Sequence, residues 1–165
     1  MTHTCRAYLD IETTGLSEYR DEITVVGICV EKGRRRFVTQ LYEDSLSEKA
    51  LLDVLRPAEA LYTYNGARFD LRFIRHHLRA DLTDLFEHCD LMHHCHRQGL
   101  YGGLKVVEHT LGIPRRTEGV DGWMAVQLWL DYRENGNRRA LAKLLKYNAE
   151  DVCNLIHLRK HLGIE

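Results

Sequence analysis

Four acidic residues and one tyrosine, in three separate segments, are of the types that carry out metal-dependent chemistry. Asp10 and Glu12 stand two positions apart in LDIETTG, at the end of an otherwise apolar run. Side chains two apart on a strand point to the same face, where two carboxylates repel each other. A shared divalent cation would remove that repulsion, because carboxylate oxygens suit Mg²⁺ and Mn²⁺. The alternative interpretation is a strand end that emerges into solvent.

The other two segments place acids on predicted helices. Asp70 in YNGARFD would open a helix after a strand, near the sheet edge where open α/β folds place their ligands, although the helix dipole alone also favours an acid there. Tyr147 and Asp151 in KYNAEDVCNL are four apart and share one helix face. That face also carries Leu144, Leu155 and Leu158. An acid and a phenol on an inward face need partners, which predicts either a functional site or a Tyr–Asp pair.

The elements that must position these residues form an α/β pattern. We predict strands over 5–11, 24–31, 35–42 and 60–65, and helices over 45–57, 68–78, 103–113, 121–135 and 138–162. Residues 85–94 fit a strand or a helix. The order implies a mixed sheet with an antiparallel first hairpin, helical crossovers to the later strands, flanking helices and a helical C-terminal half.

Taken together and in this order, the three motifs resemble those of the DEDD superfamily of 3′–5′ exonucleases. LDIETTGL matches the first exonuclease motif, YNGARFD the second, and YNAED the third in its tyrosine form. The histidine form would need His where Lys146 stands, so the resemblance is to the tyrosine subclass (DEDDy). The segment GGLKVVEHTLGI before the last two helices also resembles small bacterial domains of the same group. The matching motif residues are Asp10, Glu12, Asn65, Phe69, Asp70, Tyr147 and Asp151.

The resemblance implies a ribonuclease-H-like fold, in a single domain over 1–165, that hydrolyses phosphodiester bonds at the 3′ ends of single-stranded DNA or RNA. It also implies two divalent cations, Mg²⁺ or Mn²⁺, as cofactors. In such a site Asp10 bridges both cations, Glu12 and Asp151 hold the one that activates water, and Asp70 supports the second through water. Tyr147 then orients the attacking water, since a phenol is a poor base at neutral pH.

Five residues, two of them among the matching motif residues above, are expected to contact the substrate. By the same resemblance, Leu16 would wedge against the terminal base, Asn65 and Phe69 would lie near the terminal nucleotide, and Thr13 would approach the 3′ end through its backbone. Lys105 in GGLK is expected near the substrate. Leu16 and Phe69 would otherwise belong to the core, and Lys105 would otherwise be a surface lysine with its stem lying on apolar surface.

Two other functions fit the same fold. A ribonuclease-H-type endonuclease shares the fold and the metals, but the spacing of Tyr147 and Asp151 argues against it. A non-catalytic nucleic-acid-binding module would not need its acids, and here every expected carboxylate is present.

The charge of the chain is nearly balanced. Its 165 residues hold 23 Lys and Arg against 24 Asp and Glu, a formal charge of −1, which excludes the strongly basic character of many nucleic-acid binders. Two divalent cations would add four positive charges and bring the total to about +3. The basic residues gather in short runs that could contact phosphates or simply be solvated: KGRRR at 32–36, Arg115-Arg116 and Arg138-Arg139.

Other features of the sequence concern the location of the protein in the cell and the binding of further metals. No segment is long and apolar enough to span a membrane, and the polar start MTHTCR is not a secretory signal. Five scattered cysteines without a C-x-x-C pair predict a reduced, cytoplasmic protein. HCDLMHHCH at 88–96 is rich in zinc-ligand types, but its spacing fits no standard zinc finger.

Overall fold

Five strands form one mixed sheet in the computed structural model, which describes residues 4–165. They are β1 (Cys5–Thr13), β2 (Ile23–Lys32), β3 (Arg35–Leu41), β4 (Ala60–Thr63) and β5 (Glu87–Asp90), in the spatial order β3-β2-β1-β4-β5. The pairs β1–β2 and β2–β3 are antiparallel, and β1–β4 and β4–β5 are parallel. The predicted mixed sheet with an antiparallel first hairpin and helical crossovers is therefore confirmed.

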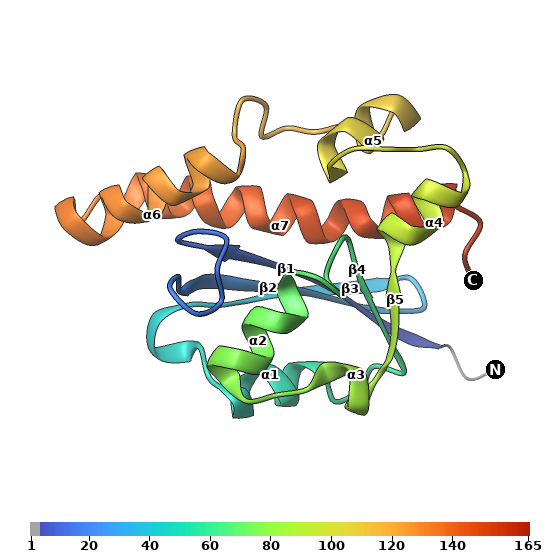
Figure 1. The fold of residues 1–165 in the computed structure, drawn as a ribbon, viewed down its shortest axis with the longest axis horizontal. Helices are drawn as coiled ribbons and strands as arrows, with labels where there is room; N and C mark the ends of the chain where they lie inside the picture. The colour runs from blue at the N-terminus through green and yellow to red at the C-terminus, as the bar shows by residue number, and fades with distance from the viewer. Residues whose placement is uncertain (1–3) are drawn as a thin grey trace.

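Helices cover both faces of the sheet (Figure 1). Over the described residues they are η1 (Glu43–Ser45), α1 (Glu48–Leu55), α2 (Asp70–Leu78), α3 (Leu82–Leu85), α4 (Leu91–Arg97), α5 (Leu104–Leu111), α6 (Gly122–Asn135) and α7 (Arg138–His161). Helices α1, α2 and α3 lie on one side of the sheet, whereas η1 is tied to α6 by bonds from Tyr132 and Arg133 to Glu43. The long α7 crosses the other face, with α4, α5 and α6 beside it. The ambiguous segment 85–94 contains both predicted types, since β5 ends where α4 begins.

Local signals set the ends of the elements. The Asn137 side chain accepts hydrogen bonds from the first N–H groups of α7, and Gly136 at φ +66° ends α6 in the left-handed region. Ser47 caps α1, so this helix begins at Glu48, three residues later than predicted. No helix within residues 4–165 is long and apolar enough to cross a membrane.

The sheet separates two apolar layers. Ala7, Leu9 and Ile11 of β1 point toward α1 and α2, whereas Tyr8 points toward α7. Both faces of β2 are buried, which explains the continuous apolar run TVVGICV. Side chains alternate along β1, so Asp10 and Glu12 lie on the same face as Tyr8, under α7. The chemistry-bearing acids therefore sit between the sheet and this helix.

Candidate active site

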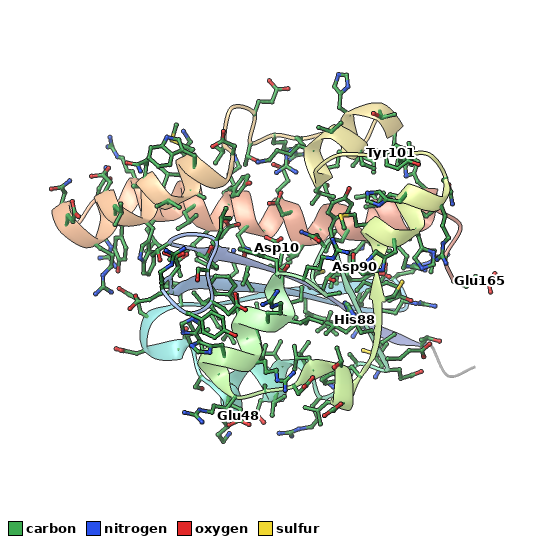
Figure 2. All side chains as sticks on the ribbon, viewed as in Figure 1. Asp10, Glu48, His88, Asp90, Tyr101 and Glu165 are labelled. Atoms are coloured by element: carbon green, nitrogen blue, oxygen red, sulfur yellow. The ribbon has the colours of Figure 1, made fainter. Side chains whose placement is uncertain are left out.

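Three carboxylates meet between β1 and α7. Asp10 and Glu12 come from β1 and Asp151 from the middle of α7, and one oxygen of each lies within 4.8 Å of the others. Figure 2 shows Asp10 in the space between the sheet and the helix. Glu12 is 7% exposed and Asp151 6%. The two motifs are 139 positions apart in the chain, and the packing of α7 across β1 brings them together.

Asp70 adds a fourth carboxylate from the start of α2. Its Oδ1 accepts a hydrogen bond of 2.9 Å from the backbone N–H of Ile11, between the two acids of β1. The loop before α2 is held by Asp90 at the end of β5, which accepts from the N–H groups of Asn65 (2.8 Å) and Ala67 (3.1 Å). The parallel strands β1, β4 and β5 thus deliver Asp70 to the same edge of the sheet.

Burial and mutual repulsion disfavour the charged form of all four acids. Burial, followed by the charges of Asp151 and Glu12, raises the pKa of Asp10 well above its ordinary value. The pKa of Glu12 rises for the same reasons, first burial and then Asp151. Burial also raises the pKa of Asp70 to about 7, against the lowering effect of its backbone hydrogen bonds. A site built of oxygen ligands and short of positive charge fits divalent cations such as Mg²⁺ or Mn²⁺.

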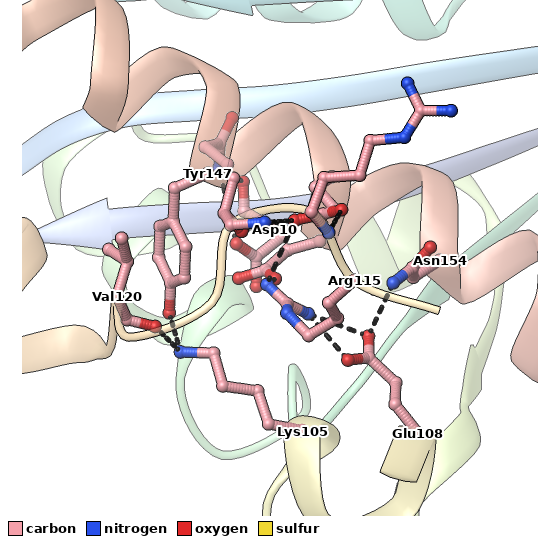
Figure 3. A network of polar contacts seen from close by, with 12 residues as sticks. Asp10, Lys105, Glu108, Arg115, Val120, Tyr147 and Asn154 are labelled. Atoms are coloured by element: carbon pink, nitrogen blue, oxygen red, sulfur yellow. Dashed lines mark hydrogen bonds and ion pairs between the residues drawn. The ribbon is translucent and has the colours of Figure 1, made fainter. Parts of the chain in front are cut away.

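Tyr147 lies one helical turn before Asp151 and is held by a lysine. Lys105 at the start of α5 donates hydrogen bonds to the Tyr147 hydroxyl (2.5 Å) and to the Val120 carbonyl (2.6 Å), as Figure 3 shows. Burial and then the charge of Asp151 raise the pKa of Tyr147 far above its ordinary value, so the phenol stays neutral. The alternative of a direct Tyr–Asp pair is therefore wrong, and Lys105 is partly buried at the site instead of lying on the surface.

Arg115 enters the same site from the loop after α5. Its guanidinium bonds Asp151 and also reaches both oxygens of Glu108, at 2.9 and 2.7 Å. Glu108 is fully buried and accepts a further bond of 3.1 Å from Asn154 (Figure 3). The alternative that Arg115 is simply solvated is wrong, because its side chain is 11% exposed and its charge compensates buried carboxylates. The sequence signal for this contact was Glu108, an acid at an inward-facing position of α5.

Asn148 is a second residue that the motif comparison passed over. It is fully buried, and its Nδ2 donates to the carbonyl and Oδ2 of Asp10 (3.2 and 3.3 Å) and to Glu12 Oε1 (3.5 Å). Its own oxygen accepts from Gln40 Nε2 at 3.0 Å. A Cβ on Gly27 of β2 would collide with this amide. A glycine inside an apolar strand is a signal of such a close approach.

A cavity of about 560 Å³ opens beside the acids. Its lining includes Asp10, Glu12, Tyr147, Asp151, Thr13, Leu16, Phe69 and Trp123. Leu16 is 86% exposed and Trp123, at the start of α6, is 71% exposed, so neither belongs to the core. Phe69 packs on Phe73 with ring centres 4.9 Å apart and also borders the cavity. Trp123 was not predicted as a site residue, since tryptophan in an amphipathic helix is usually buried.

Two other sequence expectations concern residues away from this cavity. Asn65 does not line it; this residue has φ +60°, and its backbone N–H donates to Asp90. In the segment 88–96, His88 pairs with Thr63 and Cys89 with His94. Among residues 4–165, the acidic cluster is the one group of three potential ligands close enough to share an ion.

The fold and the sequence agree on the family. A sequence profile of the RNase_H_2 family, described as RNase H superfamily, matches residues 7–163. The chain belongs to the RNase H superfamily. The predicted ribonuclease-H-like fold is confirmed. No curated protein matches the chain in a sequence search.

Solved structures share the fold of this RNase H superfamily member. The family B DNA polymerase from the hyperthermophilic archaeon Pyrobaculum calidifontis aligns with a TM-score of 0.73 and 14% identity, over 97% of this chain. The chain spans only 24% of the length of that polymerase. Brucella melitensis NrnC bound to pGG aligns with a TM-score of 0.63 and 22% identity, over 96% of this chain and 71% of NrnC. At these identities the likeness is one of fold.

Proposed function

We propose that this protein is a metal-dependent 3′–5′ exonuclease of the DEDDy type, with residues 1–165 as a single catalytic domain. The observation that carries the proposal is the convergence of four acids, three buried and one half-buried, from three separated segments beside Tyr147. Metal-dependent hydrolysis of phosphodiesters needs this excess of hard oxygen ligands. A structure of one fold relative, Brucella melitensis NrnC, holds bound Mg²⁺, which agrees with this type of cation.

The acids are the ligands in this proposal. Asp10, Glu12 and Asp151 would hold the divalent cations directly, and Asp70 would support the second cation through water. Bound divalent cations lower the pKa of the attacking water and offset the charge that develops on the phosphate. Asn148 keeps Asp10 and Glu12 in place by donating to both. Arg115 holds Asp151 through an ion pair.

Tyr147 orients the attacking water. Its hydroxyl accepts a hydrogen bond from Lys105, which leaves its own proton free to be donated to a water oxygen. Its raised pKa keeps that proton in place at neutral pH, so the phenol acts by position and not as a base. We therefore propose that Lys105 acts through Tyr147, in place of the direct substrate contact expected from the sequence.

The cavity beside the acids receives the terminal nucleotide. Leu16, Phe69 and Trp123 give it apolar and aromatic walls, against which an unpaired base can stack. Thr13 lines the same cavity next to Glu12, where its backbone can meet the 3′ end. Because stacking uses the face of the base, this arrangement accepts a single-stranded end of DNA or RNA with little preference for sequence.

The test is degradation of 5′-labelled single-stranded DNA and RNA in the presence of Mg²⁺ or Mn²⁺. We expect a ladder of products that shortens from the 3′ end, absent with EDTA and absent in D10N. Cleavage of a circular single strand would instead identify an endonuclease. Binding without any product in the wild type would identify a non-catalytic module.

A further inference from the structure

A second cavity, of about 640 Å³, lies on the outer side of α2 and has a different chemistry. It is lined by Glu18, Tyr19, Arg72, Arg75, His76 and Arg79. Three of these six side chains are arginines, and Glu18 is the one acid among them. Tyr19 is 74% exposed, and its ring lies 5.1 Å from that of His76. Cationic side chains around an exposed aromatic ring suit the phosphates and bases of a single nucleic-acid strand.

The two cavities are built on the same two segments. Leu16 in the loop after β1 and Phe69 at the start of α2 line the cavity beside the acids. Tyr19 and Arg72, each three positions further along the same loop or helix, line the second one. The exposed Leu16 lines the first cavity, and Tyr19 of the second follows it by three positions. Three residues span at most about 10 Å, so a strand whose last base lies against Leu16 has a short path to Tyr19 and the exposed face of α2.

The shape of this cationic groove, defined as the six residues above, is fixed by an ion pair. Arg72 bonds Glu18 at 2.5 Å and ties the loop to α2, with Glu18 only 13% exposed. The charge of Arg72 is thereby balanced within the groove. Arg75 is 73% exposed, and its Nε lies 3.5 Å from Asp81 Oδ2. This contact is a weak surface ion pair. Arg79 is exposed at the C-terminal end of α2. Arg75 and Arg79 are thus the cations available to phosphates.

We propose that the cationic groove binds the nucleotides upstream of the terminal one, so that the protein holds a single-stranded oligonucleotide of several nucleotides. This inference rests on the proposed function and extends it from the reacting end to the strand behind it. It also accounts for nucleic-acid binding by a chain of formal charge −1, since the positive charge is concentrated where the backbone of the strand passes.

The test compares oligonucleotide lengths in the D10N background, in which turnover is blocked. Fluorescence anisotropy gives the Kd of a labelled single-stranded 2-mer and 8-mer at several salt concentrations. In R75Q/R79Q we expect the Kd of the 8-mer to rise about tenfold at low salt, and the salt slope to fall by about 1.4 because two phosphate contacts are lost. The Kd of the 2-mer stays unchanged. R34Q/R35Q removes the same charge from the exposed β2–β3 turn and serves as the matched control.

Tyr19 provides an independent readout of the same groove. Y19A should weaken binding of the 8-mer by about fivefold or more, and Y19F should restore it, because stacking needs the ring and not the hydroxyl. The thermal melting temperature shows that each variant is folded.

Any of three outcomes would contradict the proposed role of the cationic groove. The Kd of the 8-mer could be unchanged in R75Q/R79Q, R34Q/R35Q could raise the Kd of the 8-mer as much as R75Q/R79Q does, or R75Q/R79Q could raise the Kd of the 2-mer as much as that of the 8-mer. The experiments also distinguish a failure of the groove proposal from a failure of the proposed nuclease function. If the wild type produces the ladder of shortened products while R75Q/R79Q binds the 8-mer with unchanged Kd, only the proposed role of the groove is wrong. If the wild type degrades nothing and the length-dependent loss is seen, the groove stands and the nuclease activity does not.

Discussion

Two polar clusters lie between the sheet and α7, and their charges are arranged in opposite ways. Toward the C-terminal end of the helix, Glu31 of β2 is a single carboxylate, 5% exposed, among several cationic partners. Arg36 and Arg159 approach it at 3.6 Å and Lys160 at 3.7 Å, and the Tyr8 hydroxyl donates to it at 3.0 Å. Its negative charge is fully compensated within the protein.

Near the middle of α7 the balance is reversed. Asp10, Glu12, Asp70 and Asp151 gather in a largely buried space, and among residues 4–165 only Asp151 of the four forms an ion pair, with Arg115. The same helix and neighbouring strands frame both clusters, so burial alone does not distinguish them. The balanced cluster stabilises the packing of α7. In the proposed function, the acidic cluster would lower the stability of the metal-free fold and would gain its compensation from bound cations.

The largest expected effect comes from removing one acid of the acidic cluster. D10N should lower the rate of Mg²⁺-dependent hydrolysis by more than about 10³-fold, since an essential ligand is lost. Its thermal melting temperature in EDTA should equal or exceed that of the wild type, because repulsion is relieved. Turnover at the wild-type rate, or a clearly lower melting temperature, would contradict the charge imbalance that we infer.

The same substitution in the balanced cluster should have the opposite consequences. E31Q leaves the buried Arg159 without its counter-charge, and we expect a loss of about 3 kcal/mol in the free energy of unfolding. Urea denaturation measures this loss. Activity below the unfolding transition should stay within about twofold of the wild type. A stable E31Q protein with reduced activity would show that the two clusters are coupled.

The stability of the metal-free protein should depend on pH through Asp70. Its pKa is about 7 in the folded protein, above the ordinary value of 3.8. Between these values the folded state holds a proton that the unfolded state releases, so stability falls as pH rises toward 8. D70N should therefore be more stable than the wild type at pH 8 in EDTA, by a few kcal/mol, and about equally stable near pH 4. If the stability advantage of D70N over the wild type does not change with pH, the pKa of Asp70 is not raised in the folded protein.

A smaller effect is expected from the neutral donor of the acidic cluster. N148A removes hydrogen bonds to Asp10 and Glu12 without changing the charge, and should weaken Mg²⁺ binding about tenfold. Isothermal titration calorimetry measures this binding directly. N148D, which adds a fifth carboxylate, should be less stable in EDTA than N148A. Unchanged Mg²⁺ affinity in N148A would limit this residue to packing against Gly27.

The smallest effect concerns the cavity beside the acids, for which the balanced cluster has no counterpart. W123A should raise KM for a single-stranded substrate about tenfold with little change in kcat, while W123F should restore most of the affinity. Trp129 is half-buried against the core, so W129F leaves the exposed Trp123 as the single tryptophan, whose fluorescence reports stacking of a nucleotide without turnover. An unquenched signal would exclude Trp123 from the binding surface.

The sequence by itself determined which face of each element the candidate site residues occupy. Period-two alternation puts Asp10 and Glu12 on one face of β1, and helical spacing puts Tyr147 and Asp151 on one face of α7. These are short-range consequences of backbone geometry, which the sequence contains in full. The order of the motifs was sufficient to indicate the fold, which the sheet order β3-β2-β1-β4-β5 confirms.

Only the tertiary structure decided what stands opposite those faces. Arg115 reaches Asp151 because the loop after α5 folds back onto α7, across 36 positions of sequence. Asn148 reaches Asp10 across 138 positions because Gly27 leaves room for it. Trp123 faces the cavity because of how α6 is placed beside the loop after β1. Periodicity predicts the direction of a side chain but not its partner, since the partner depends on long-range packing that no local pattern encodes.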